Sequence, residues 1–387
     1  MIEQAKSPQR LQVTLAVSGA FHHFDLAREL EARGFLKAIY STFPWTRLKR
    51  EGVSREFVHI FPWIHTPLVV LGSRFKLPDN LGRSLSGMVP RTLDAWVART
   101  MPDCDVYIAI SGSGVSSGRR AQSRGVKYVC DRGSSHIRYQ DKILREEFER
   151  WGAHRIVCDP RIFAREEAEY EQADAITVPS EFARRSFVEM GVQAEKLHRI
   201  PYGVRLDRFL PVSQPAIDHF DILFVGQVGL RKGVPYLLQA FRQLNHPHKR
   251  LRFVGAVQPE LANLLPQLPT EGVEFLGSLP QDKLPAIMSS SHVMVLPSIE
   301  EGLALVQAQS MACGCPLISS YNTGGEDLFT DGVEGFLVPI RSPEAIAIRL
   351  QELADDPQLQ QYMSRAHLNV SIKWEDGMNM ERLGLNF

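Results

Sequence analysis

The chain has 387 residues, more than one hydrophobic core usually organises, so two domains are expected. Its 44 basic residues equal its 44 acidic residues, which disfavours a nucleic-acid-binding protein, although a local basic patch stays open. Hydrophobic residues make up 44% of the chain, as in an ordinary globular protein.

The cysteines and the apolar stretches indicate the cellular compartment of the protein. The five cysteines lack the spacing of a zinc site or a disulfide framework. The first ten residues lack the apolar stretch of a secretory signal. The apolar stretch 61–71 contains two prolines and falls short of the roughly 20 residues that span a bilayer. We therefore expect a cytoplasmic protein with reduced thiols.

Short apolar strands alternate with amphipathic segments along the chain. In the first half, strands are expected at 11–17, 38–40, 105–110, 127–130 and 175–178. In the second half, they are expected at 221–225, 251–254, 273–276, 292–296 and 316–319. Strands of this length, separated by helical stretches, indicate parallel βαβ winding in two similar halves.

Residues 201–215 separate the two halves. They contain three prolines and no sustained periodicity, so they are predicted to form the interdomain linker. In open parallel sheets, ligands bind beyond the carboxyl ends of the strands. The loops that follow the strands are therefore where the chemistry is expected.

A turn and two cations follow the strand 221–225. Gly226 begins the turn, and Arg231 and Lys232 precede a segment with helical periodicity, 234–244. The free N–H groups of a helix start, together with these two cations, suit a diphosphate. The alternative interpretation is a solvated pair of cations at a helix start.

Two carboxylates follow the strand 292–296. Glu300 and Glu301 precede a helix that is predicted to begin near Gly302, and Gln309 lies about two turns into that helix. One carboxylate could accept hydrogen bonds from sugar hydroxyls, and Gln309 could still reach a ligand. For Glu300 the favoured interpretation is that it only decorates the helix N-terminus, where the helix dipole favours acids.

These two elements resemble signatures of the family 4 glycosyltransferases, and further matches lie at 173–180, 200–204, 308–316, 321–326 and 331–339. The resemblance covers most of the chain and is weak before residue 100. It implies an α/β architecture of the GT-B type, with two Rossmann-like parallel-sheet domains facing across a cleft. The implied parts are an acceptor domain at 1–205, a nucleotide-sugar donor-binding domain at 206–370, and a segment at 371–387 that packs back on the first domain.

The resemblance also implies roles for the donor site. Arg231 and Lys232 would bind the donor diphosphate, and Glu301 would contact the transferred sugar and help stabilise its developing positive charge. Where the family usually has a second glutamate that contacts the ribose, this chain has Gln309, which loses about 1 kcal/mol of charge assistance. The implied donor-binding residues are Gly19, Gly226, Arg231, Lys232, Gly302, Leu303, Leu305, Val306 and Gln309.

The catalytic group of the first half stays open between two residues. The loop 18–23 takes the place of the family's N-terminal glycine loop, so the backbone at Gly19 is expected to approach the donor. Asp131 follows the strand 127–130, and His136 comes five residues later, near a position where many relatives carry a histidine. Asp131 and His136 are both candidates to act beside Glu301, and for either residue the alternative is a purely structural role.

The resulting hypothesis is a retaining glycosyltransferase of hexosyl type that uses a nucleotide-diphosphate sugar and a hydroxyl acceptor (a glycan, a lipid or a small molecule). No Asp-x-Asp motif lies near a strand end, so neither a metal nor another cofactor is expected. Two alternatives stay open: a catalytically silent nucleotide-sugar-binding protein and a nucleotide-sugar epimerase. Residues 45–75 mix basic and aromatic side chains, which suits peripheral membrane contact, although an ordinary surface of the first domain is the alternative.

Overall fold

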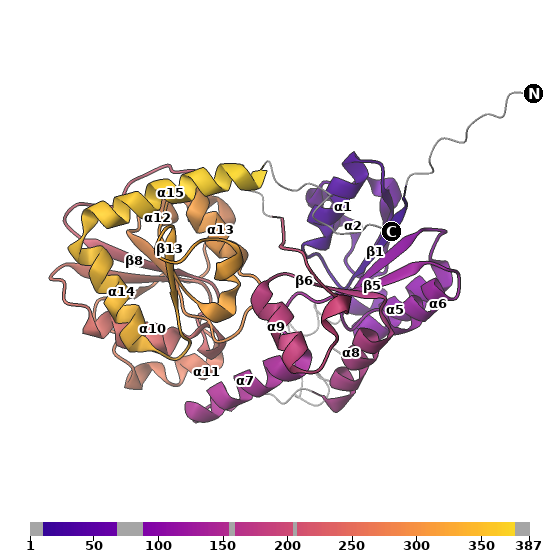
Figure 1. Cartoon of the computed structure of the whole chain (residues 1–387), viewed down its shortest axis with the longest axis horizontal. Helices are drawn as coiled ribbons and strands as arrows, with labels where there is room; N and C mark the ends of the chain where they lie inside the picture. The colour runs from indigo at the N-terminus through magenta and orange to yellow at the C-terminus, as the bar shows by residue number, and fades with distance from the viewer. Residues whose placement is uncertain (1–10, 68–87, 155–158, 204–206, 376–387) are drawn as a thin grey trace, which may run out of the picture. The chain divides into compact units, whose positions relative to one another are not determined.

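The computed structural model describes residues 11–67, 88–154, 159–203 and 207–375 (Figure 1). By their contacts, the residues group into two compact units. The first unit comprises Met1–Gly133, Val157–Thr177 and Val192–His198. The second comprises Ser134–Ile156, Val178–Gly191 and Arg199–Phe387.

The first sheet has seven strands in the order β3-β2-β1-β4-β5-β6-β7. The strands are β1 (Val13–Val17), β2 (Leu36–Ser41), β3 (Val58–Ile60), β4 (Val106–Ile110), β5 (Lys127–Asp131), β6 (Ala175–Val178) and β7 (Leu197–Arg199). β1 pairs in parallel with both β2 and β4, and all five of its residues are buried, as is usual for a strand covered on both faces. The strand order reverses between β1 and β4.

Helices connect these strands: α1 (His23–Ala32), α2 (Trp45–Leu48), α5 (Met88–Thr100), α6 (Val115–Gln122) and α8 (Pro160–Gln172). The helix α1 buries Phe24, Ala27 and Leu30, which recur every third residue on one face and join the core beside β1. Because α1 begins at His23, the loop between β1 and α1 is short and stays at the carboxyl end of β1.

The second sheet has six strands in the order β10-β9-β8-β11-β12-β13. The strands are β8 (Phe220–Val225), β9 (Lys249–Val254), β10 (Val273–Phe275), β11 (Val293–Leu296), β12 (Leu317–Ser320) and β13 (Gly335–Val338). The helices are α10 (Val234–Gln243), α11 (Pro259–Ala262), α12 (Leu284–Ser289), α13 (Leu305–Ala312), α14 (Pro343–Asp355) and α15 (Pro357–Glu375). Here the order reverses between β8 and β11, so the loops after these two strands meet at one edge.

Two helices from the first half of the sequence belong to the second unit: α7 (Ile137–Arg150) and α9 (Glu181–Glu189). Ile143 and Leu144 of α7 lie in the same buried cluster as Phe220 of β8. Each of the two units is therefore made of several separate segments of the sequence. The division into an acceptor domain, a donor-binding domain and a closing segment, at 1–205, 206–370 and 371–387, stays a prediction. Residues 376–387 lie outside the described residues.

The predicted class of two parallel-sheet α/β units is confirmed. All ten predicted strands are present, and the additional strands β3, β7 and β13 have only three or four residues each. The helix predicted to begin near Gly302 begins instead at Leu305. In the predicted linker, Phe209 is buried in the core of the second unit. No helix among the described residues is long and apolar enough to cross a membrane.

Candidate functional site

The loop after β8 brings the two predicted cations against the loop after β11. Arg231 and Lys232 lie in a short 3-10 turn, and Gly233 then adopts a left-handed φ of 67° before α10. A Cβ at Gly233 would lie 2.0 Å from the carbonyl oxygen of Pro297, so only glycine allows this approach. The N–H of Ile299 donates to the carbonyl oxygen of Arg231 at 2.8 Å, which fastens the two loops together.

Glu300 fixes the guanidinium of Arg231. The Nε of Arg231 donates to the carbonyl oxygen of Glu300 at 3.0 Å, and Nη2 lies 3.0 Å from the carboxylate Oε2. The side chain of Glu300 is completely buried, whereas that of Arg231 is 42% exposed. Arg231 is thus anchored by Glu300 although much of its side chain is exposed.

The carboxylate of Glu300 is bound by the start of α7 as well. It accepts hydrogen bonds from Ser134 Oγ at 2.6 Å, Ser135 Oγ at 2.7 Å and Gln140 Nε2 at 2.9 Å. Burial raises the pKa of Glu300, but the Arg231 charge and these hydrogen bonds outweigh it and lower the pKa to about 2. The interpretation that Glu300 only decorates a helix end is therefore wrong, because this carboxylate is a buried anchor.

The second cation pairs with the second carboxylate. Lys232 Nζ forms an ion pair with Glu301 Oε1, and both side chains are 15% exposed. The ammonium group also lies within 3.8 Å of the position that a Cβ on Gly226 would occupy, so the absence of a side chain there leaves room for it. The structure thus brings together Gly226, Arg231, Lys232 and Glu301.

The helix α13 begins at Leu305, four residues after Glu301. The carbonyl oxygen of Gly302 accepts a 2.5 Å hydrogen bond from Ser180 Oγ, and the N–H of Ala304 donates to the carbonyl oxygen of Thr323. Leu303 and Ala304 are buried. These contacts hold the backbone out of the helix until Leu305, which explains the late helix start.

The first turn of α13 has no side-chain cap. The N–H groups of a first turn have no partner within the helix, so those of Leu305 and Val306 suit an anion. Both residues are partly exposed. Gln309 is also partly exposed and lies about one turn into the helix rather than two.

His136 forms the N-cap of α7. Its Nδ1 accepts a 3.2 Å hydrogen bond from the N–H of Arg138, and its own N–H donates to Ser186 Oγ at 2.9 Å. The ring packs edge-on against Phe187 and is nearly inaccessible. This geometry accounts for His136 as a helix cap in the second unit, and its catalytic involvement stays a prediction.

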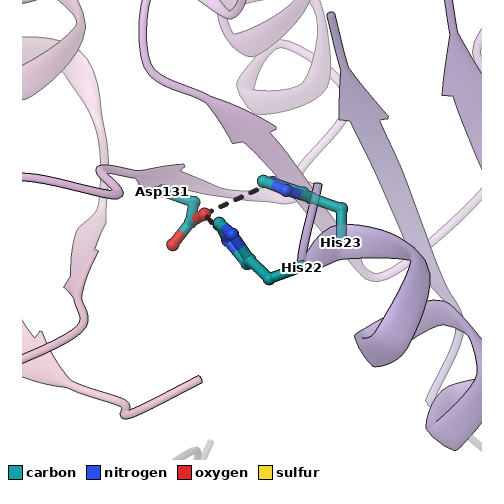
Figure 2. Close-up of side chains that lie close together, drawn as sticks. All are labelled: His22, His23 and Asp131. Carbon is teal, nitrogen blue, oxygen red and sulfur yellow. Dashed lines mark hydrogen bonds and ion pairs between the residues drawn. The ribbon is translucent and has the colours of Figure 1, made fainter. Parts of the chain in front are cut away.

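Asp131 is the centre of a polar cluster in the first unit (Figure 2). It ends β5, and its Oδ2 lies 2.6 Å from Nε2 of His22 and 3.3 Å from Nε2 of His23. Its Oδ1 accepts a 2.6 Å hydrogen bond from Thr177 Oγ1. Burial raises the pKa of Asp131, but His22, His23 and the Thr177 hydrogen bond outweigh it, so the net shift is downward. The carboxylate is therefore ionised at neutral pH.

The family models divide the chain into the same two halves as the sequence pattern. The model for glycosyl transferases group 1 matches residues 211–369, and the model for Glycosyltransferase Family 4 matches residues 19–208. The chain belongs to the family 4 glycosyltransferases.

Among curated relatives, it is 29% identical over 188 residues to α-D-kanosaminyltransferase of Streptomyces kanamyceticus, covering 44% of this chain and 48% of that protein. It is also 29% identical to a D-inositol 3-phosphate glycosyltransferase of Kribbella flavida, covering 52% and 53%.

This family 4 chain thus spans about half the length of the curated relatives that it matches. Among solved structures, it is similar to Anabaena HepE in complex with UDP, with a TM-score of 0.68, 16% identity, and coverage of 97% of this chain and 99% of that one. It is also similar to sucrose-phosphate synthase from Thermosynechococcus elongatus, with a TM-score of 0.69, 19% identity and 97% coverage of both chains. At these identities the likeness confirms the GT-B fold.

The contacts of His22 and His23 with Asp131 were not predicted from the sequence. The prediction for the loop 18–23 concerned Gly19, which has a left-handed φ of 117° and whose carbonyl oxygen accepts a 2.6 Å hydrogen bond from Ser41 Oγ. The available signal was the pair of adjacent histidines after β1, because β5, which ends at Asp131, is only two strands from β1. The donor role of Gly19 stays a prediction.

Of the residues described, His22, His23 and Asp131 form a group that could hold a metal ion, with ligand atoms within 4.8 Å of one another. Two ligand atoms on a tetrahedral zinc ion lie about 3.3 Å apart, given zinc–ligand bonds of about 2.0 Å. The 2.6 Å between His22 and Asp131 is shorter and is a hydrogen-bond length. The geometry therefore favours a hydrogen bond between His22 and Asp131 over a metal ion at this position.

A cavity of about 690 Å³ lies elsewhere in the second unit. It is lined by residues that include Trp151, Gln239 and Pro269. None of its lining residues is a predicted site residue. The candidate donor site is therefore formed by the loops after β8 and β11.

Proposed function

We propose that this chain transfers a hexosyl group from a nucleotide-diphosphate sugar to a hydroxyl acceptor, with retention of anomeric configuration. The observation that carries the proposal is the juxtaposition of Arg231, Lys232 and Glu301 beside the uncapped start of α13. The family membership and the complexes of Anabaena HepE with UDP and UDP-glucose support a nucleotide-sugar donor.

The diphosphate would bind the two cations. Arg231 can engage two phosphate oxygens with its planar fork, and Lys232 contributes a point charge. The N–H groups of Leu305 and Val306 would add hydrogen bonds. All of these groups stabilise the charge that develops on the leaving nucleotide, and this is how such a site lowers the barrier.

Glu301 would bind the sugar. An incoming diphosphate competes with Glu301 for Lys232, and this releases the carboxylate for the sugar hydroxyls and the developing positive charge. The backbone from Gly302 through Leu303 would face the sugar, and Gln309 the ribose. In this proposal the cations replace a metal ion, so no cofactor is required.

The acceptor would be a glycan, a lipid or a small molecule carrying a hydroxyl, with no nucleic-acid partner. Retention would follow from attack on the face from which the nucleotide departs. The reaction would take place in the cytoplasm.

Peripheral membrane contact is proposed for residues 45–67, and the remainder of the predicted stretch, 68–75, lies outside the described residues. Trp63 is 76% exposed, the guanidinium of Arg47 lies 4.0 Å from the ring centroid of Phe43, and the Arg50 side chain is 69% exposed. Exposed aromatic and basic side chains of this kind suit an anionic lipid surface. Co-sedimentation with anionic vesicles, but not with neutral ones, tests this contact.

Gln309 favours one alternative: a catalytically silent nucleotide-sugar-binding protein. The amide lacks the charge that a glutamate would offer to the ribose hydroxyls, so binding without turnover is the rival outcome. A nucleotide-sugar epimerase would instead change the sugar without transferring it.

Incubating the protein with a panel of UDP-, GDP- and ADP-sugars separates these functions. Release of free nucleotide supports transfer or hydrolysis, an altered sugar supports epimerisation, and binding without turnover supports the silent protein. The anomeric configuration of the product, read by NMR, tests retention. If no donor is bound or turned over, the proposed function is wrong.

Two substitutions test the diphosphate site. Arg231→Ala and Lys232→Ala should each weaken binding of the active donor by about 10- to 100-fold, since a charged hydrogen bond contributes about 1.5–3 kcal/mol. Arg365→Ala and Lys283→Ala remove exposed cations elsewhere in the second unit and should leave affinity unchanged. Equal affinities in all four variants would refute the site.

A further inference from the structure

Two histidines lie side by side at the amino edge of the second sheet. His219 directly precedes β8, and His248 directly precedes β9. The two strands pair in parallel with Phe220 opposite Lys249, and the N–H of Phe220 donates to the carbonyl oxygen of His248 at 2.9 Å. The strand register therefore holds His219 next to His248, and the centroids of their rings are 6.1 Å apart.

The separation of the two rings is close to that of two imidazoles bound to one metal ion. With zinc–nitrogen bonds of about 2.0 Å and tetrahedral angles, two bound rings have their centroids about 5 Å apart. The side chain of His219 is 42% exposed, and His248 is an exposed residue. Because exposed side chains rotate freely, a small movement of the rings closes the remaining difference.

Asp218 determines which nitrogen of His219 carries the proton. Nδ1 of His219 lies 2.9 Å from Oδ1 of Asp218. An exposed carboxylate is ionised at neutral pH and only accepts hydrogen bonds, so Nδ1 is the donor. In the neutral ring the lone pair then lies on Nε2, which is the nitrogen that can bind a metal ion. A carboxylate bound to the far nitrogen of a histidine is the usual outer partner in metal sites, where it orients the ring and makes it a better ligand.

A third histidine, His246, lies beside the pair and has a different hydrogen bond. Its Nδ1 accepts from the N–H of His248 at 3.2 Å, so the lone pair on this nitrogen is already used. The three histidines line one cavity of about 520 Å³, together with Ile217, Asp218 and Pro247. His246 therefore shares the surroundings of the pair, and it offers a matched control for it.

We propose that His219 and His248 bind one divalent transition-metal ion of the kind that imidazole nitrogen prefers, such as zinc. Water completes the coordination, and Asp218 orients the ring of His219. The ion joins the segment that leads into β8 to the segment that leads into β9. Since β8 has six residues, at about 3.3 Å each, the site lies roughly 20 Å from the loop that follows β8. The proposal is therefore independent of the transferase function.

Calorimetric titration of the full chain, prepared without a histidine tag, tests the site. Zn²⁺ should bind as one ion per chain, and Mg²⁺, which prefers oxygen ligands, should not compete for it. His219→Gln and His248→Gln should each weaken zinc binding at least about tenfold, the smallest loss that is usual even for an outer partner. Absence of zinc binding by the wild type, or equal affinity in the wild type and both variants, would overturn the proposal.

Two control variants separate this site from the other histidines. His246→Gln removes a ring from the same cavity, and His22→Gln breaks the group around Asp131 in the first unit. Both variants should bind zinc with wild-type affinity. A loss in either control that equals the loss in His219→Gln would assign the ion to other ligands and refute the proposed pair.

Thermal unfolding gives a second readout that shows whether the variants fold. In zinc-free buffer, His219→Gln should have the same Tm as the wild type, because the substituted ring lies at the surface. A ligand that binds the folded chain stabilises it, so Zn²⁺ should raise the Tm of the wild type and of His246→Gln but not that of His219→Gln. An equal rise in all three proteins would place the ion elsewhere. These measurements contain no sugar donor, so their outcome is separate from that of the donor panel.

Discussion

The guanidinium of Arg231 contacts Glu300 twice. Its Nε donates to the carbonyl oxygen of Glu300, and its Nη2 lies beside the carboxylate, both at 3.0 Å. The carboxylate is fully buried and receives further hydrogen bonds from Ser134, Ser135 and Gln140. One side chain thus links the start of α7 to a cation of the proposed donor site.

Glu300→Gln should destabilise the protein by about 3 kcal/mol, because the buried donors around it lose a charged acceptor and the new amide group meets donors instead. Urea denaturation, monitored by tryptophan fluorescence, measures the change. Glu271→Gln is the control, since Glu271 is exposed and its replacement should cost less than about 0.5 kcal/mol. Equal stabilities of the two variants would show that the Glu300 contacts contribute little.

His23 should make the first unit sensitive to acid. Its pKa is lowered in the folded state from 6.5 to about 3, so below pH 6.5 the unfolded chain binds a proton that the folded chain does not. The stabilising effect of keeping His23 neutral is therefore present above pH 6.5 and is lost as the pH falls toward 3, by at most about 1.4 kcal/mol per pH unit.

The control for this acid sensitivity is His23→Leu, which cannot bind a proton. The free energy of unfolding, measured by urea denaturation across the same pH range, should fall less steeply in His23→Leu than in the wild type. Parallel curves for the two proteins would contradict the low pKa of His23.

Gly233→Ala should disrupt the proposed donor site, whereas Gly332→Ala should not. Both glycines have a left-handed φ, 67° and 78°, but a Cβ would lie 2.0 Å from Pro297 at the first position and would meet nothing within 4 Å at the second. We expect Gly332→Ala to cost about 1 kcal/mol of stability through backbone strain alone. Gly233→Ala should cost more and should also weaken binding of the active donor, as measured by calorimetry. Similar losses in both variants would mean that backbone strain accounts for the effect.

Gln309→Glu should strengthen binding of the nucleotide sugar. A carboxylate would accept charged hydrogen bonds from the ribose hydroxyls, and the gain of about 1 kcal/mol corresponds to roughly fivefold in Kd. Gln361→Glu, an exposed site on α15, serves as the control for added negative charge. Weaker binding by Gln309→Glu would show that Gln309 does not contact the ribose.

The sequence was most informative for the buried strands, since continuous apolar runs such as 222–225 are what a strand covered on both faces requires. It was least informative where partners are distant in sequence. Glu300 accepts a hydrogen bond from Ser134, which is 166 positions away in the sequence. Gly302, just before α13, accepts one from Ser180, which is 122 positions away. Such contacts leave no local pattern of periodicity or capping, so neither could be predicted from the sequence around them.

The position of α7 has a practical consequence for dissecting this protein. Ile143 and Leu144 fill part of the core around Phe220, and Glu147 accepts hydrogen bonds from Tyr236 at 2.8 Å and from Arg341 at 2.6 Å. A gene fragment that starts in the linker would lack this helix, exposing apolar side chains and stranding two polar partners. We expect such a fragment to be insoluble, whereas a permuted chain carrying α7 in front of β8 should be far easier to purify.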